Sequence, residues 1–225
     1  MFIFLSHKID SDTPVYGGKE GFISKSTSSI KNGDNANTSN WSFPNHIGTH
    51  IDFPYHFYDK GQTIEDFSPD LFIYKEKDIQ LLEFDLPKNK LLIKPDYLKE
   101  GRLNTNSKII LLKTGADSYR KKEKFWKYNP GISVEMAKWI QNTFQSLQLI
   151  GIDSISISSW QHREIGRKVH KIFLNPKNPI LLVEDMNLSK VNKKTQIRMI
   201  IIAPMRVSHA NGCPCTVLAE VNTNR

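Results

Sequence analysis

The chain has 225 residues, and 39% of them are hydrophobic, which is typical of a folded protein and excludes a disordered one. No apolar run reaches the ~20 residues needed to span a bilayer, and Cys213 and Cys215 are too few for a disulfide framework. The formal net charge is +8, but the basic residues are scattered and form no stripe interleaved with aromatic residues. We therefore expect a solvated lysine-rich surface, which would also attract an anionic substrate, and neither a nucleic-acid nor a membrane partner.

The first half of the chain is predicted to be mostly β-structure. Strands are expected over residues 2–9, 21–31, 41–57, 78–86 and 108–113. Asn32-Gly33-Asp34 is a strong hairpin-turn signal after the second of these strands. Residues 109–112 form a continuous apolar run, which predicts a strand buried on both faces.

The second half alternates predicted helices with strands. Ser133 is a candidate N-cap for a helix to about Leu147, in which Ala137, Ile140 and Phe144 recur at helical steps. A second helix is expected over residues 164–174, and strands over residues 149–157, 179–183, 197–207 and 216–221. We predict one mixed α/β domain over residues 1–225. The opening apolar stretch is too short for a signal peptide, so a cytoplasmic location is the expectation.

Residues 46–56 contain the most informative pattern of the chain. Gly48 and Pro54 oppose a helix here, whereas in an extended chain His46, His50, Asp52 and His56 would share one face. Imidazoles and carboxylates bind zinc, and manganese or iron as the carboxylate share rises. The pattern therefore predicts a divalent metal site rather than a run of surface histidines.

Three ligands from one short segment leave a metal under-coordinated, so further ligands are expected elsewhere in the chain. The histidine candidates are His7, His162, His170 and His209. His170 lies on a predicted helix, and Glu184 follows a buried apolar strand, where a carboxylate is costly unless it is paired or metal-bound. From these residues alone, a solvated Glu184 is an equally good interpretation. Cys213 and Cys215 are interpreted as structural.

Residues 46–56 resemble the His-x-Gly-Thr-His-x-Asp-x-Pro-x-His signature of the cyclase-like metal-dependent hydrolases, whose best-known members are bacterial kynurenine formamidases. Residues 151–154, His170 and residues 180–188 look like the second signature of this family, although Asp185-Met186 stands where the family has Asn-Leu. The resemblance implies a swivelling β/β/α fold with a central mixed sheet flanked by helices. It also implies a homodimer or homotetramer.

The resemblance further implies a centre of one or two metal ions, zinc first and manganese second. His46, His50 and Asp52 would hold one ion, and Asp52 would bridge to a second ion held by His170 and Glu184. His162 remains the rival of His170 as the distant histidine ligand.

The implied chemistry is metal-assisted hydrolysis of a small amide, foremost an aryl formamide. His56 would be the general acid/base, titrating near ~6.5 if unperturbed, or else a histidine that only orients a ligand. Tyr16 stands where kynurenine formamidases carry Trp and is a candidate substrate contact, or otherwise a turn anchor. The alternatives are an isatin-like cyclic-amide hydrolase or cyclase, and a metal-dependent binding protein without turnover.

Overall fold

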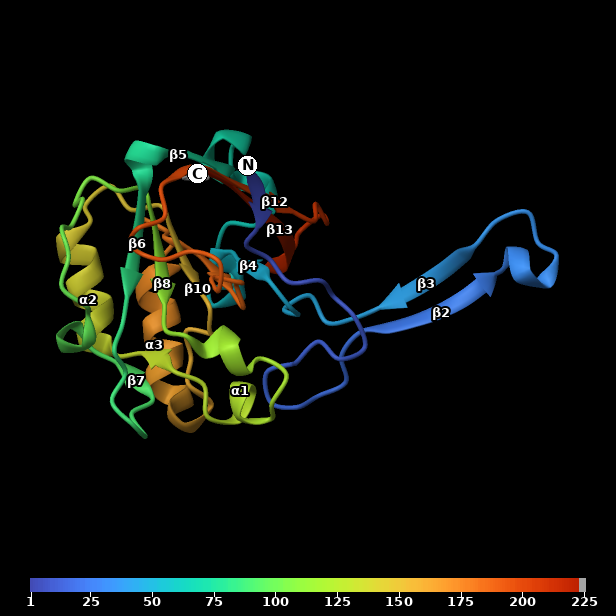
Figure 1. Cartoon of the computed structure of the whole chain (residues 1–225), viewed down its shortest axis with the longest axis horizontal. Helices are drawn as coiled ribbons and strands as arrows, with labels where there is room; N and C mark the ends of the chain where they lie inside the picture. Colours follow the sequence, from blue (N-terminus) through green and yellow to red (C-terminus); the bar gives the residue numbers. More distant parts are fainter. Residues whose placement is uncertain (223–225) are drawn as a thin grey trace.

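The computed structural model describes residues 1–222 and is built around one nine-stranded mixed sheet (Figure 1). The strand order is β5-β12-β13-β4-β11-β10-β8-β6, with β1 also paired to β13. The strands are β1 (Phe2–Phe4), β4 (His50–Asp52), β5 (Ile73–Lys75), β6 (Ile79–Glu83), β8 (Ile109–Lys113), β10 (Leu149–Ile152), β11 (Leu181–Glu184), β12 (Ile197–Pro204) and β13 (Gly212–Val221). A single short turn, η5 (Glu76–Asp78), joins β5 to β6, so the two ends of the sheet lie near each other and the sheet is almost closed.

Strand β4 joins two differently connected halves of this sheet. On one side, β11, β10, β8 and β6 run parallel to one another. On the other side, β13, β12 and β5 are antiparallel. β4 is antiparallel to both of its neighbours, and its residue His50 pairs with Glu184 of β11 and with Pro214 of β13. This central position places β4 where side chains from both halves meet.

Two helices, α2 (Val134–Thr143) and α3 (Arg163–Phe173), flank the parallel half of the sheet and pack against each other (Figure 1). The short helix α1 (Lys124–Lys127) lies beyond the strand ends and contacts the turns η7 (Ala116–Tyr119) and η8 (Trp160–His162). Ser133 caps α2, because its Oγ accepts a hydrogen bond from Met136 N at 3.0 Å. Ile109 to Leu112 of β8 are fully buried, as predicted for a strand covered on both faces.

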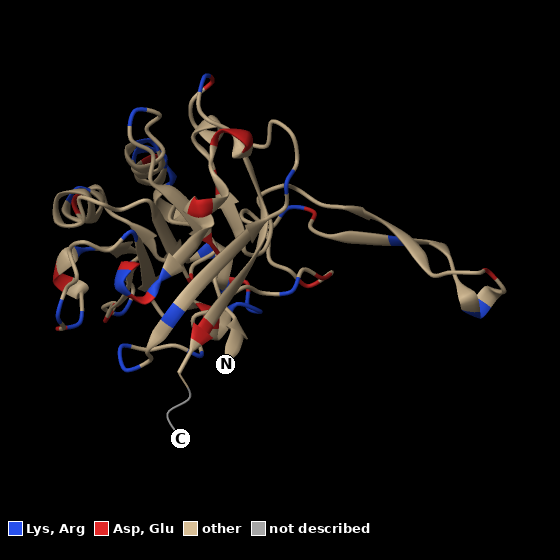
Figure 2. Ribbon diagram, turned by 90° about the horizontal axis from the view of Figure 1, so that it is seen from above, with Lys and Arg blue, Asp and Glu red and all other residues tan. Residues whose placement is uncertain are grey.

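A two-stranded arm projects far from the body of the molecule (Figures 1 and 2). It consists of β2 (Ile23–Ser28) and β3 (Thr38–Ser42), paired antiparallel. Nearly all of its strand residues are exposed, and Trp41 retains 67% of its accessible surface. A second small pair, β7 (Leu92–Ile93) with β9 (Gly131–Ile132), is parallel and lies in the body.

Short 3-10 turns make up much of the remaining structure. They are η1 (Ile30–Asn32), η2 (Pro54–His56), η3 (Ile64–Asp66), η4 (Pro69–Phe72), η5 (Glu76–Asp78), η6 (Pro95–Tyr97), η7 (Ala116–Tyr119) and η8 (Trp160–His162). Within residues 1–222, no helix has both the length and the apolar character that crossing a membrane would require.

The predicted fold class, a mixed α/β domain with a central mixed sheet flanked by helices, is confirmed. Most predicted elements differ from the observed ones by a few residues at their ends; α2, for example, ends at Thr143 rather than near Leu147, and β13 begins at Gly212 rather than at residue 216. Three predicted strands differ most. The strand expected over residues 41–57 is interrupted, because Gly48 turns the chain and Pro54 begins a 3-10 turn. The strand expected over residues 2–9 ends at Phe4, and the one over residues 149–157 ends at Ile152, before an irregular serine-rich segment.

Candidate active site

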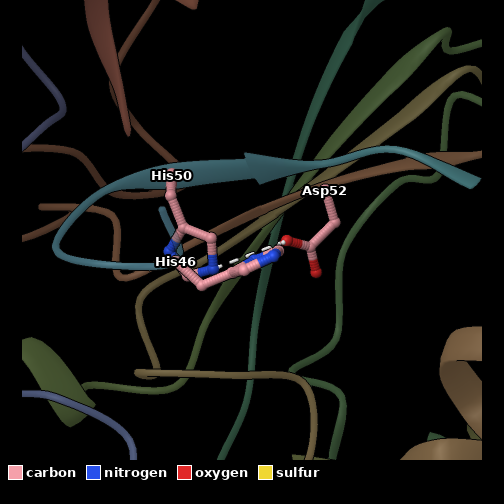
Figure 3. Close-up of side chains that lie close together, drawn as sticks. All are labelled: His46, His50 and Asp52. Carbon is pink, nitrogen blue, oxygen red and sulfur yellow. Dashed lines mark hydrogen bonds and ion pairs between the residues drawn. The ribbon is translucent and has the colours of Figure 1, made fainter. Parts of the chain in front are cut away.

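The side chains of residues 46–56 converge through two turns rather than along one continuous strand. Only His50–Asp52 is β-strand. Gly48, at φ +58°, turns the chain before this strand, and η2 bends it afterwards. A positive φ suits glycine because it has no Cβ. The turn at Gly48 therefore lets His46 fold back toward Asp52, as Figure 3 shows.

His46 is held beside Asp52 by the residues that lead into β13. Its Nδ1 lies 2.8 Å from Asp52 Oδ1, and its Nε2 lies 3.0 Å from Asn211 Oδ1. Gly212 leaves the space for this ring, since a Cβ at that position would lie 2.3 Å from His46 Cε1. The close approach of ring and backbone therefore requires glycine at position 212.

Glu184 and His170 complete the cluster from β11 and α3. His50 Nε2 lies 3.5 Å from Asp52 Oδ1 and 3.4 Å from Glu184 Oε2. His170 Nε2 lies 3.4 Å from Glu184 Oε1 and 3.7 Å from Asp52 Oδ2. The two carboxylates thus lie between the two Nε2 atoms, and all four side chains are buried.

Backbone carbonyls orient both of these histidines. Gly48 O lies 2.9 Å from His50 Nδ1, and Gly166 O lies 2.9 Å from His170 Nδ1. A carbonyl only accepts, so each Nδ1–H donates, and each Nε2 faces the carboxylates. This use of the second ring nitrogen is usual for histidines that bind metals.

The charges in this buried cluster depend on one another. Burial alone would lower the pKa of both histidines. A hydrogen bond to Glu184 and the charge of Asp52 instead raise the pKa of His50 to about 9, and hydrogen bonds to Asp52 and Glu184 raise that of His170 to about 10. Burial would likewise raise the pKa of Asp52, but His46 and His170 beside it hold that pKa well below its usual range. Burial and the charge of Asp52 oppose ionisation of Glu184, yet bonds from His170 and His50 lower its pKa to about 2. The cluster therefore stabilises two adjacent negative charges.

These five residues offer two groups of ligand atoms that share Asp52. His46, His50 and Asp52 form one group, and Asp52, His170 and Glu184 form the other, with the atoms of each group within 4.8 Å of one another. Among residues 1–222, no lysine or arginine pairs with either carboxylate. Two buried carboxylates facing imidazole nitrogens are a donor set that fits a divalent cation.

His56 lies beside this cluster without belonging to either group. Its ring stacks on that of His46, with centroids 4.0 Å apart and planes inclined by 31°. Burial lowers the pKa of His56 to about 4. The negative charge of Asp52 opposes this shift, but the charges of His46 and His170 add to it. His56 is therefore neutral at pH 7, and its titration lies below the ~6.5 expected for an unperturbed imidazole.

A cavity of about 310 Å³ opens onto the cluster and contains Tyr16 in its lining. The ring of Tyr16 meets that of Trp160 edge-on, with their centroids 5.1 Å apart. Tyr16 therefore both packs against Trp160 and lines the cavity. His162 is exposed and does not line this cavity, so the structure brings His170 and not His162 to the cluster. His7 lies near Asp185 instead, and His209 lies near Glu65 on the surface.

Comparisons with known proteins agree with this geometry. The family profile described as "Putative cyclase" matches residues 3–159 of the chain. The chain belongs to the cyclase family. It is 29% identical over 229 residues to Cyclase-like protein 2 of Arabidopsis thaliana, covering 93% of this chain and 75% of that protein.

A second relative is the kynurenine formamidase of Bacillus thuringiensis (strain Al Hakam), which is 24% identical over 213 residues, covering 95% of this chain and 94% of the relative. The solved structure of isatin hydrolase A from Labrenzia aggregata bound to benzyl benzoate has the same fold. It aligns with a TM-score of 0.76 at 18% identity, over 97% of this chain and 93% of that chain.

This cyclase-family site also contains residues that our sequence analysis missed. Glu184 Oε1 accepts hydrogen bonds from Ser156 Oγ at 2.9 Å and from Ile157 N at 2.8 Å. Ser154 and Ser156 fall within the strand predicted over residues 149–157, and serine is unusual in a buried strand. These serines were therefore a signal for such polar contacts. Asn211, and two arginines of α3 that line the cavity, were also missed.

Proposed function

We propose that this chain is a metal-dependent hydrolase of a small amide, and specifically of an aryl formamide. The observation that carries the proposal is the sharing of Asp52 by two groups of potential ligand atoms that line a cavity. His46, His50 and Asp52 would hold one ion, and Asp52, His170 and Glu184 a second. Zinc suits the imidazole share of this donor set, and manganese is the next choice. A bound divalent metal would polarise the amide carbonyl and make water more acidic.

The protein's own residues would bind the substrate and move the proton. Neutral His56 has the protonation state of a base, so it would accept a proton from the attacking water and return it to the leaving nitrogen. The C–N bond breaks, and formate and an aromatic amine leave. The rings of Tyr16 and Phe57 line the cavity and would contact the aromatic part of the substrate.

Metal reconstitution with paired substrates tests this function. The purified protein is treated with a chelator, reloaded with zinc or manganese, and assayed with formanilide and with isatin. We expect metal-dependent release of formate from formanilide. Metal-dependent opening of isatin alone would assign the cyclic-amide reaction instead. Stoichiometric metal binding without turnover of either compound would favour a binding protein.

We also propose that the protein acts as a homodimer or homotetramer, because of the projecting arm. An isolated hairpin is marginally stable in water, and this one is exposed along both strands, with few charged residues (Figure 2). The exposed Trp41 and Ile30 offer apolar contact to a second copy. Light scattering after gel filtration should give a multiple of 25.9 kDa, and Trp41→Ser should weaken the assembly. A wild-type protein of 25.9 kDa in solution would contradict this proposal.

A further inference from the structure

Two arginines of α3 share one face of that helix with His170. Arg163, Arg167 and His170 are spaced at i, i+4 and i+7, which places them in one stripe. Both arginines line the 310 Å³ cavity together with the histidine cluster. At a rise of ~1.5 Å per residue, Arg167 lies about 4.5 Å and Arg163 about 10 Å along the helix axis from His170. The axial separation of about 10 Å between His170 and Arg163 is large enough for one aromatic ring.

Neither arginine has an acidic partner. Among residues 1–222, no carboxylate lies within 4.0 Å of either guanidinium, whereas Arg120 is paired with Asp185 at 2.6 Å. Arg163 is positioned by an aromatic ring instead, since its Cζ lies 4.4 Å from the ring centroid of Trp160. Trp160 in turn contacts Tyr16 edge-on. Two exposed cationic groups thus line the cavity, and neither is paired with an acid within residues 1–222.

The hydroxyl group of Tyr16 gives a second, independent observation. Its oxygen is buried and makes no hydrogen bond with the geometry required of one within residues 1–222, although the Ser158 side chain lies near it. A buried polar atom without a partner is costly, so a ligand atom that accepts its hydrogen is favoured there. Burial raises the pKa of the Tyr16 phenol, and the charges of Arg163 and Arg167 are close enough to oppose that rise. The phenol and both guanidiniums therefore act on the same region of the cavity.

We propose that the substrate carries a carboxylate, bound by Arg163 and Arg167 with Tyr16 as a further donor, in the cavity that the histidine cluster also lines. The planar guanidinium matches a carboxylate with two parallel hydrogen bonds, which explains why arginine serves here better than lysine. This inference rests on the proposed amide hydrolysis, because the reacting bond lies in the same cavity. It narrows the substrate class to aromatic amides that carry an acid group.

The test compares 3- and 4-formamidobenzoate with formanilide, which lacks the carboxylate. The measured quantity is the ratio of kcat/KM for each acid to kcat/KM for formanilide. A charge-assisted hydrogen bond of typical strength predicts that Arg163→Gln and Arg167→Gln each lower this ratio roughly 10- to 100-fold, chiefly through KM. Lys168→Gln is the matched control, because Lys168 is exposed on the same helix but does not line the cavity. This control should leave the ratio unchanged.

A binding measurement separates this inference from the proposed hydrolysis. Calorimetry on the metal-loaded protein compares benzoate with benzamide. Benzoate binding that weakens about tenfold in Arg167→Gln but not in Lys168→Gln supports the carboxylate site, even if no formamide is hydrolysed. If formamides are hydrolysed and the substrate ratio is the same in all variants, the carboxylate site is overturned while the hydrolase stands. Benzoate binding that is independent of both arginines also overturns it.

Discussion

His50 of β4 pairs directly with Glu184 of β11, and its Nε2 lies 3.4 Å from the Glu184 carboxylate. The candidate metal site is therefore built across a strand pair rather than within one loop. A shift of one residue in this register would turn both side chains away from each other. The sheet that forms the core thus also fixes the spacing of the ligand atoms.

Ser156→Ala should weaken metal binding without unfolding the protein. The Ser156 hydroxyl donates to Glu184 Oε1, and loss of such a supporting bond to a ligand typically lowers metal affinity ~10–100-fold. Competition titration of zinc against a chromophoric chelator measures this change. Ser118→Ala is the matched control, because its exposed hydroxyl bonds only Gly115 O. Equal zinc affinity in both variants would show that Ser156 does not support Glu184.

Gly212→Ala should displace His46 and remove one ion while leaving the other bound. The new Cβ would lie 2.3 Å from His46 Cε1, whereas His170 and Glu184 lie on other elements. Elemental analysis per subunit is the measurement. Gly101→Ala is the control, because the nearest atom to its new Cβ, Lys99 O, is 4.0 Å away. Full metal content with intact activity in Gly212→Ala would contradict the arrangement described for His46.

His7 should make stability depend on pH between about 4 and about 6.5. Burial and the nearby Arg120 lower the pKa of His7 from 6.5 to about 4. In this window the unfolded chain binds a proton that the folded chain does not, so the free energy of unfolding falls as pH falls. The stabilisation is fully present above about pH 6.5.

Urea unfolding of the chelator-treated protein at about pH 7.5 and about pH 5 measures this effect. His7→Gln should lose less stability between the two values than the wild type does. His209→Gln is the control, because the side chain of His209 is 84% exposed. If His7→Gln and His209→Gln lose as much stability as the wild type, His7 does not contribute to this pH dependence.

The closeness of the residues in the local part of the candidate site follows from the sequence. His46, His50, Asp52 and His56 lie within eleven residues, and their spacing limits how far apart they can be. The predicted continuous strand was nevertheless wrong. Gly48 adopts a positive φ and Pro54 begins a 3-10 turn, and the alternation of side chains along the sequence predicts neither conformation. The rings converge through these turns instead.

The distant part of the site could not be resolved from the residues alone. His162 and His170 are separated by two helical turns, and only the packing of α3 against the sheet decides which one faces Glu184. Ser156 was assigned to a strand that ends at Ile152. The arginines were overlooked as single charges, although their spacing from His170 already placed them on one helix face.

The rate of formate release by His56→Ala, loaded with the same metal content as the wild type, tests the proposed mechanism most directly. His56 lies outside both ligand groups, so the variant should keep its metal. A general acid/base contributes ~10²–10⁴-fold in rate, and we expect a loss of kcat of that size with formanilide or a formamidobenzoate. An unchanged rate at full metal content would contradict the catalytic role of His56, and loss of metal together with activity would make His56 a ligand instead.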